Sequence, residues 1–373
     1  MKGPYFLGKG VGLRRLASTL LVVALVAASI ELTCFVWEDF ISPSGWRPRY
    51  AQRPVEVVAP WLTESDPWGA WHLPNATSHQ EKSCFSVTLR SNAYGARDRE
   101  RELAGNPHRT IVLGDSFAEG FGVEAEERVS DLLEQKLKRE FLNFGAQYDF
   151  GPLQYQIIYD KLASRFTHDQ VLILFLPDND FTDNDLDFWR RYRVDFSRRY
   201  RPYYQTTADG YAPYYPVPNP KDPVAPAALP GLFASVVNTV ADNSWAVAAY
   251  RDVRLSDSRP KHYSGYFEFS DAQLKAVLWS FVQIKKRADE RNVTIAIIPR
   301  RNDFARVAAE GRNRLGDIMQ RFGAENGIDI VDLLRLMPTI EPDTDKYFLP
   351  CDEHWSPLGH RIAAEVLERM LHY

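Results

Sequence analysis

The chain lacks the features that mark several large protein classes. Its 45 Lys and Arg are balanced by 49 Asp and Glu, which leaves a net charge of -4 and no basic surplus for binding nucleic acid. It contains no Gly-x-Ser-x-Gly elbow, no Walker phosphate loop and no dinucleotide-binding glycine pattern. It also has no internal repeat of fixed period and no low-complexity block. We therefore expect neither a nucleic-acid partner nor a nucleotide cofactor.

Long apolar runs are scarce too, and the one that stands out covers residues 16–37, with Glu31 as its only charge. At helical rise this run can cross a hydrocarbon core of about 30 Å. Four Lys or Arg residues precede it and two acidic residues follow it, so the positive-inside rule places residues 1–15 in the cytoplasm and the rest outside. A cleaved signal peptide is the alternative, but the apolar stretch continues well past the small residues at 26–28, which favours a retained anchor.

Cysteine is also rare, with only Cys34, Cys84 and Cys351 present. Cys34 lies within the apolar run, so the other two are the only cysteines outside it. An oxidising compartment would allow them to pair, and the bond would tie residues 38–108 to a loop near the C-terminus. Two free thiols remain the alternative, because sequence spacing does not give the distance between two sulfur atoms.

From residue 109 onward, strand-like and helix-like patterns alternate. Short apolar runs predict five strands, and a 3.6-residue periodicity predicts the helices between them. The strands are expected at 110–113, 142–144, 171–176, 293–298 and 328–331, and the helices at 129–141, 153–165, 272–291 and 304–326. This alternation is typical of a parallel sheet covered by helices, a three-layer α/β/α fold within one domain over residues 109–373.

Two segments fall outside this alternation. Residues 38–108 are rich in Pro, Trp and charge, which predicts an irregular lead-in with a few strands. Residues 181–266 are rich in Tyr, Arg and Pro and are too long for an ordinary crossover loop, so we expect an inserted cap. Tyrosines around 203–215 would suit stacking on sugar rings, although a packed structural insertion explains them equally well.

A serine, a histidine and an acid stand where the fold can bring them together. The segment TIVLGDSFAEGFGV delivers Ser116 at the carboxyl end of the first predicted strand, where open α/β sheets keep their chemistry. Asp352 and His354 precede the last helical pattern. In such a set His354 is the general base that activates Ser116, and Asp352 orients the imidazole.

Two neighbouring residues have simpler interpretations. Asp115 is expected to brace the turn that carries the serine, because a carboxylate there can accept local N–H groups. His360 lies six positions after His354, but this spacing without further clustered ligands is a weak metal signal. We expect His360 at the surface or the rim of the site and expect no metal.

Four ordered blocks resemble the GDSL or SGNH hydrolase superfamily over about residues 108–373. They are Gly114-Asp115-Ser116, Asn143-Phe144-Gly145, Asn179-Asp180 and Asp352-x-His354. The resemblance implies a five-stranded, flavodoxin-like parallel sheet and no cofactor. It also implies that an oxyanion is held by the Ser116 amide, a backbone amide near Gly145 or Tyr148, and the Asn179 side chain.

One departure from the family pattern concerns this oxyanion site. The second block ordinarily reads Asn-x-Gly-x-x-Gly, and Tyr148 stands where its last glycine is expected. Since only glycine adopts a positive φ at little cost, the donor geometry could be altered. A weakened or non-catalytic descendant is therefore an open alternative.

Two further likenesses indicate a biological setting. Asp352-x-His354 followed by Trp355 is similar to the alginate O-acetyltransferase group, and residues 92–97 resemble the lead-in of membrane-anchored members found with bacterial polysaccharide modification systems. The function expected is that of a single-pass protein of the bacterial inner membrane, whose periplasmic part is a serine esterase that removes O-acyl (acetyl) groups from a carbohydrate through an acyl-enzyme. The alternatives are an O-acetyltransferase using the same residues, or a catalytically silent carbohydrate-binding or scaffold subunit of an export complex. Envelope polysaccharide-modification proteins are the expected partners.

Overall fold

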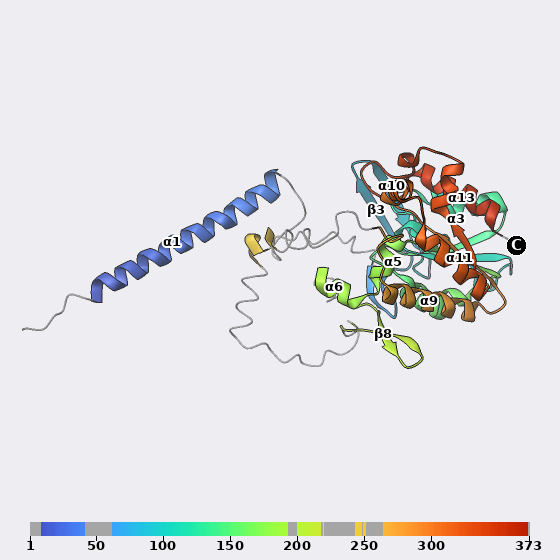
Figure 1. Cartoon of the computed structure of the whole chain (residues 1–373), viewed down its shortest axis with the longest axis horizontal. Helices are drawn as coiled ribbons and strands as arrows, with labels where there is room; N and C mark the ends of the chain where they lie inside the picture. The colour runs from blue at the N-terminus through green and yellow to red at the C-terminus, as the bar shows by residue number, and fades with distance from the viewer. Residues whose placement is uncertain are drawn as a thin grey trace, which may run out of the picture. The chain divides into compact units, whose positions relative to one another are not determined.

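The computed structural model describes most of the chain, and Figure 1 shows its course. The described residues are 9–41, 62–192, 200–217, 219, 243–247, 249–250 and 264–371. The chain divides into two compact units, one formed by residues 57–224 with 261–373 and the other by residues 1–56 with 225–260.

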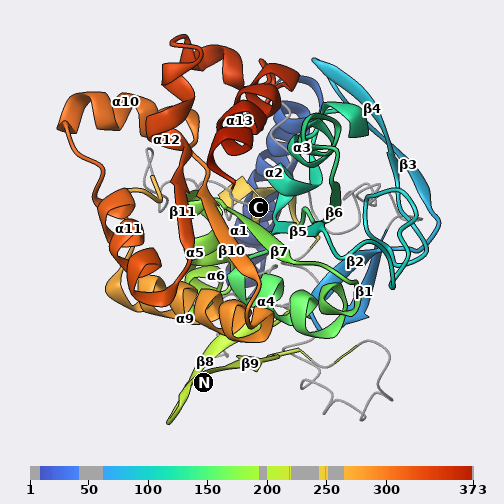
Figure 2. The ribbon, with the colours of Figure 1, turned by 90° about the vertical axis from the view of Figure 1, so that its right-hand side faces the viewer.

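A five-stranded parallel sheet forms the centre of the larger unit (Figure 2). Its strands are β5 (Arg109–Gly114), β6 (Glu140–Gly145), β7 (Gln170–Phe175), β10 (Asn292–Ile297) and β11 (Asp329–Asp332). They lie in the order β11-β10-β7-β5-β6, which in chain order is the flavodoxin-like arrangement 2-1-3-4-5. The predicted fold class is confirmed.

Each face of the sheet carries its own hydrophobic core. Along β5, Ile111 and Leu113 contribute to one core and Val112 to the other, as the two-residue period of a strand requires. Helices cover both faces, which is why the central strands read as continuous apolar runs (Figure 2). On one face α3 (Val129–Leu137) packs with α13 (Pro357–Met370), and on the other α4 (Pro152–Lys161) packs with α9 (Asp271–Ala288).

The four predicted helices end earlier than expected, and two of them show the reason. The helix predicted over 304–326 is two helices, α10 (Arg301–Glu310) and α11 (Arg314–Asn326), because Gly311 takes a left-handed conformation with φ 68° and terminates the first. The helix predicted over 129–141 stops at Leu137, where Lys138 adopts φ 53°, and the chain then enters β6.

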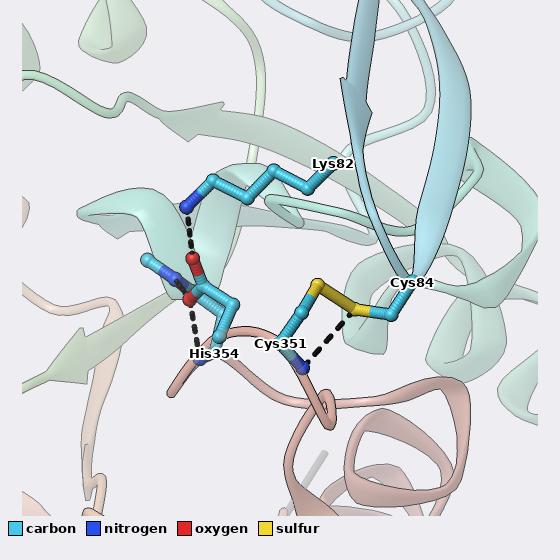
Figure 3. The surroundings of a disulfide bond; sticks show 5 residues. Lys82, Cys84, Cys351 and His354 are labelled. Carbon is cyan, nitrogen blue, oxygen red and sulfur yellow. Dashed lines mark hydrogen bonds and ion pairs between the residues drawn. A yellow bond between two sulfur atoms is a disulfide. The ribbon is translucent and has the colours of Figure 1, made fainter. Parts of the chain in front are cut away.

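The lead-in contains two antiparallel hairpins. They are formed by β1 (Leu62–Asp66) with β2 (Gly69–His72), and by β3 (Thr77–Lys82) with β4 (Phe85–Arg90). Cys84, in the β3–β4 turn, forms a disulfide with Cys351, with a Cα–Cα distance of 5.7 Å (Figure 3). The predicted pairing is confirmed, and it joins the hairpin to the loop that carries Asp352.

The tyrosine-rich part of the insertion forms a hairpin of β8 (Tyr203–Thr207) and β9 (Gly210–Tyr214) that packs on α9. Tyr203 is fully buried, and the Tyr204 hydroxyl lies 2.7 Å from the Ser280 hydroxyl. Tyr211 meets the ring of Trp279 edge to face, at 5.8 Å between centroids. These contacts favour the interpretation of the hairpin as a packed structural insertion.

In the smaller unit, α1 (Lys9–Val36) contains the predicted apolar run except its last residue, Trp37. By length and composition its segment Arg14–Val36 could cross a membrane.

The disulfide closes a loop of 267 residues, so it removes much freedom from the unfolded chain. Replacing both Cys84 and Cys351 by Ser should lower the free energy of unfolding by about 2–5 kcal/mol. The measurement is the thermal unfolding of the detergent-solubilised full chain, with Cys34→Ser as the control. Alkylation of unreduced protein should modify Cys34 alone, and rapid modification of Cys84 and Cys351 before reduction would contradict the pairing.

Candidate active site

Ser116 begins the short helix α2 (Ser116–Glu119) directly after β5. The helix starts there because the carboxylate of Asp115 accepts a hydrogen bond from the Phe117 amide at 2.9 Å, and it ends at Gly120, which adopts φ 86°. Asp115 thus braces the turn as expected, and burial raises its pKa to about 7. The strand, cap and short helix hold the serine at the carboxyl edge of the sheet.

The three residues predicted from the two ends of the chain meet at this edge. Ser116 Oγ lies 2.7 Å from His354 Nε2, and His354 Nδ1 lies 2.5 Å from Asp352 Oδ1. The same carboxylate oxygen accepts the His354 backbone N–H at 3.0 Å. The Asp-x-His spacing therefore works because the aspartate folds back onto the histidine two residues later, in the manner of an Asx turn.

Two phenylalanines from the serine loop enclose the imidazole. The ring of Phe121 stacks on His354 with 4.3 Å between centroids, and Phe117 lies at 4.9 Å. Burial lowers the pKa of His354 and outweighs the opposite effect of Asp352, while the positive charges of Arg300 and Lys82 lower it further. The imidazole is therefore neutral at pH 7, which is the form that a general base requires.

Asp352 stays ionised beside this base. Burial alone would raise the pKa of its carboxyl, but the hydrogen bonds from His354 and Lys82 outweigh burial and pull the pKa well below its usual range. An acid that remains charged can fix the tautomer of His354 and stabilise the imidazolium that forms during catalysis.

Sequence reasoning missed Lys82, the last residue of β3. Its Nζ lies 2.5 Å from Asp352 Oδ2, so the two carboxylate oxygens have different partners (Figure 3). The ammonium group also stands 5.3 Å from the centre of the Phe121 ring. No sequence pattern singles out this lysine, although the predicted Cys84 pairing already places its hairpin near the acid.

Arg97, the last residue of the lead-in motif at residues 92–97, binds the backbone of the loop that follows Ser116. The buried guanidinium of Arg97 donates to three backbone carbonyls, those of Glu119 at 2.9 Å, Gly120 at 2.5 Å and Val123 at 2.7 Å. These carbonyls flank Phe121, so Arg97 fixes the segment whose ring stacks on His354.

Gly145 and Asn179, both expected at the oxyanion site, lie at or just beyond the carboxyl ends of β6 and β7, the two strands that flank β5. Gly145 ends β6, but its amide donates to the Asn143 side chain at 2.8 Å. A Cβ on Gly145 would lie 2.4 Å from the Glu119 nitrogen, so glycine is required by the close approach of α2. Asn179 lies half-buried in α5 (Pro177–Asp183), immediately after β7.

Tyr148 adopts φ 79°, so the backbone keeps the conformation that a glycine would take there. Holding a tyrosine in this region costs of order 1 kcal/mol. The departure from the family pattern therefore changes the side chain and leaves the left-handed conformation in place.

The expectation for His360 was wrong. Its side chain is fully buried on the inner face of α13, where Nδ1 accepts the Val129 amide at 3.3 Å. Burial lowers its pKa to about 3. Within the described residues, no group of three or more His, Cys, Asp or Glu side chains is placed to hold a metal ion.

The pH dependence of ester hydrolysis should report on Lys82. Because the pKa of His354 is lowered, kcat/KM should stay on its plateau at neutral pH and fall only below the ordinary histidine pKa of about 6.5. Lys82→Met removes a positive charge that lowers this pKa, so the acidic limb should move to higher pH, and Lys82→Arg should restore it. Lys136→Met, which removes a lysine paired with Glu368, is the control. An unchanged profile in Lys82→Met would contradict this role.

Glycine should be more stable than alanine at both position 148 and position 145, for different reasons. Tyr148→Gly should be more stable than Tyr148→Ala by about 1 kcal/mol, because glycine adopts the positive φ freely. Gly145→Ala should destabilise the chain, because the added carbon meets α2. Thermal unfolding of the three variants checks both statements, and an alanine more stable than glycine at 148 would be inconsistent with the left-handed backbone.

Comparison with known proteins gives one family match. Residues 268–372 match the model described as "SGNH hydrolase-like domain, acetyltransferase AlgX". This segment runs from just before α9 through α13 and includes Asp352 and His354 but not Ser116. No curated protein matches the chain.

Similar solved structures include a lipase/acylhydrolase from Enterococcus faecalis, at 15% identity, covering 70% of this chain and 94% of that one with a TM-score of 0.37. A member of the lipolytic G-D-S-L family from Veillonella parvula shares 11% identity, covering 71% and 98% with a TM-score of 0.36. A carbohydrate esterase family 2 enzyme from Myceliophthora fergusii shares 12%, covering 71% and 65% with a TM-score of 0.37.

The matched segment contains Asp352 and His354, whose side chains meet Ser116 at the edge of a flavodoxin-like sheet. Residues 268–372 are thus similar to an SGNH hydrolase-like domain, in a family described as an acetyltransferase.

Proposed function

We propose that this chain is a membrane-anchored, extracytoplasmic serine esterase that removes O-acyl groups, chiefly acetyl, from a carbohydrate. The observation that carries the proposal is the hydrogen-bonded series from Ser116 through His354 to Asp352. It provides a nucleophile, a neutral base and an ionised acid in one line.

The reaction follows from this geometry. His354 Nε2 takes the proton of Ser116 as Oγ attacks the acyl carbonyl, and the imidazolium then returns that proton to the departing sugar hydroxyl. The acyl group is left as an ester on Ser116. Water, deprotonated by His354, attacks this ester, and the carboxylic acid leaves as the serine regains its proton.

The oxyanion formed in each step needs donors. Ser116 is the first residue of α2, so its amide has no carbonyl partner within the helix. The amide of Gly145 is already used by Asn143. The Ser116 amide and the Asn179 side chain are therefore the proposed donors, each contributing about 3–4 kcal/mol to the transition state.

An O-acetyltransferase is the second candidate, because the acyl-enzyme is common to both reactions and the matching family is described as an acetyltransferase. Transfer requires a bound sugar hydroxyl to reach the acyl-enzyme before water does. The packing of Tyr203, Tyr204 and Tyr211 on and beside α9 makes the tyrosine hairpin a weak candidate for that task. Hydrolysis, unlike transfer, needs no partner protein that delivers an acyl donor, so we rank the esterase ahead of the transferase.

A catalytically silent carbohydrate-binding or scaffold subunit is the third candidate. The short contacts between Ser116, His354 and Asp352, and the additional support from Lys82 and Arg97, argue against it. The segment Arg14–Val36 and its flanking charges support placement in a bacterial inner membrane, with the active site in the periplasm. Envelope polysaccharide-modification proteins are the proposed partners.

Ser116→Ala should lower kcat for an aryl acetate by about 10⁴-fold or more, because the members of such a triad act as a unit. A fluorophosphonate should label wild-type protein at Ser116. Ser164→Ala is the control, because the Ser164 hydroxyl donates to the nearby Asp160 carbonyl, and it should retain turnover. Retained turnover in Ser116→Ala would remove the esterase assignment.

Hydrolysis and transfer are separated by following the acetyl group. Wild type, but not Ser116→Ala, should release free acetate from an acetylated polysaccharide without an added donor. If an added acetyl donor and glycan instead give acetylated glycan with negligible free acetate, the transferase is correct.

A further inference from the structure

Glu31, the single charge in the apolar run, has partners in the insertion. One oxygen of its carboxylate accepts a hydrogen bond from the Ser244 hydroxyl, and the other accepts the Trp245 amide at 2.7 Å. All three residues belong to the smaller unit, which combines residues 1–56 with 225–260. Part of the segment that sequence patterns assign to a cap therefore packs against the N-terminal helix.

The covered side chains of α1 form one narrow face. Residues 14–30 are all exposed, whereas Glu31, Cys34 and Phe35 are partly covered. Positions i, i+3 and i+4 lie on the same side of a helix. The ring of Trp245 meets Phe35 edge to face at 5.2 Å and is itself only 6% exposed. The carboxylate contact is thus accompanied by an apolar contact on the adjacent turn.

The local structure around Ser244 leaves its hydroxyl proton available to donate to Glu31. Residues 245–247 and 249–250 are helical, and the Ser244 hydroxyl oxygen accepts the Val247 amide at 3.0 Å, as the residue capping the start of a helix does. Its proton remains for Glu31. The Ser244 hydroxyl therefore caps the helical segment that begins at residue 245 and, at the same time, donates a hydrogen bond to Glu31 of α1.

The contact matters because Glu31 lies in the segment proposed to cross the membrane. A carboxylate within an apolar span is costly unless a hydrogen-bond donor satisfies it. Glu31 lies five residues before the end of α1, about 8 Å along the helix, on the side that the positive-inside rule places outside the cytoplasm. The insertion can reach it from that side without crossing the bilayer. Residues 223–241, which precede Ser244, contain no charged side chain.

We propose that the insertion returns to the membrane and docks on the anchor helix through Glu31, Ser244 and Trp245. The occupant of this helix face is the chain's own segment around Ser244 and Trp245, residues 243–247, which is a second membrane-contacting element. The inference rests on the proposed anchoring of α1 but not on the esterase chemistry. It makes α1 a helix with a specific binding face, which a cleaved signal peptide or an interchangeable anchor would not need.

Disulfide trapping in native membranes tests the docking. In full-length protein carrying Cys34→Ser, the pair Phe35→Cys and Trp245→Cys is oxidised mildly, digested without reduction, and searched by mass spectrometry for the joined peptides. The matched control is Thr33→Cys with Trp245→Cys, since position 33 lies on the opposite side of α1. We expect the 35–245 product in severalfold excess over the 33–245 product. Adding Glu31→Ala should reduce this excess, and Glu31→Gln, which keeps one acceptor, should reduce it less.

The outcomes separate the docking from the other proposals. Equal yields for the two pairs, with α1 present in the digest, would overturn the docking and leave the anchor intact. Absence of every peptide N-terminal to residue 37 from mature protein would overturn both the anchor and the docking. Turnover of an aryl acetate, measured on the same membranes, reports on Ser116 separately from either result.

Discussion

The carboxylate of Asp352 is the interaction on which the rest of the site depends. One of its oxygens accepts both the ring N–H and the backbone N–H of His354, and the other accepts the ammonium of Lys82. With 11% of the side chain exposed, such a charge is stable only when its acceptors are used. The supporting structure around the site can be understood as the means of keeping these donors in place.

That support comes from outside the sheet as much as from within it. The Cys84–Cys351 bond fastens the lead-in hairpin next to the acid, and Arg97 fixes the serine loop through three carbonyls. The lead-in is therefore part of the active site, although it precedes the first sheet strand. The sheet contributes the position of Ser116, at the point where the strand order reverses between β5 and its two neighbours.

The elements that local patterns determine could be predicted from sequence. The five sheet strands are short apolar runs buried on both faces, and Ser116, Asp352 and His354 follow from the rule that such sheets place chemistry at strand ends. Lys82 could not be found in this way, because its role arises from a contact with a residue 270 positions away. His360 was misplaced because a lone histidine in a helical pattern does not show which face of the helix turns inward. The partners of Glu31 were missed because the sequence around Ser244 and Trp245 carries no sign of what it packs against.

The separation of 238 residues between Ser116 and His354 also determines when the site can assemble during synthesis of the chain. At synthesis rates of about 5–20 residues per second, the histidine leaves the ribosome roughly 10–50 s after the serine. During that interval the serine loop can form with the strands already made, but its nucleophile has no base and remains inert. The bond with Cys84 can form only after Cys351 has been synthesised, and it is favoured by an oxidising environment such as the proposed placement outside the cytoplasm would provide. Reactivity towards esters is thereby delayed until His354 has been synthesised and has packed against Ser116.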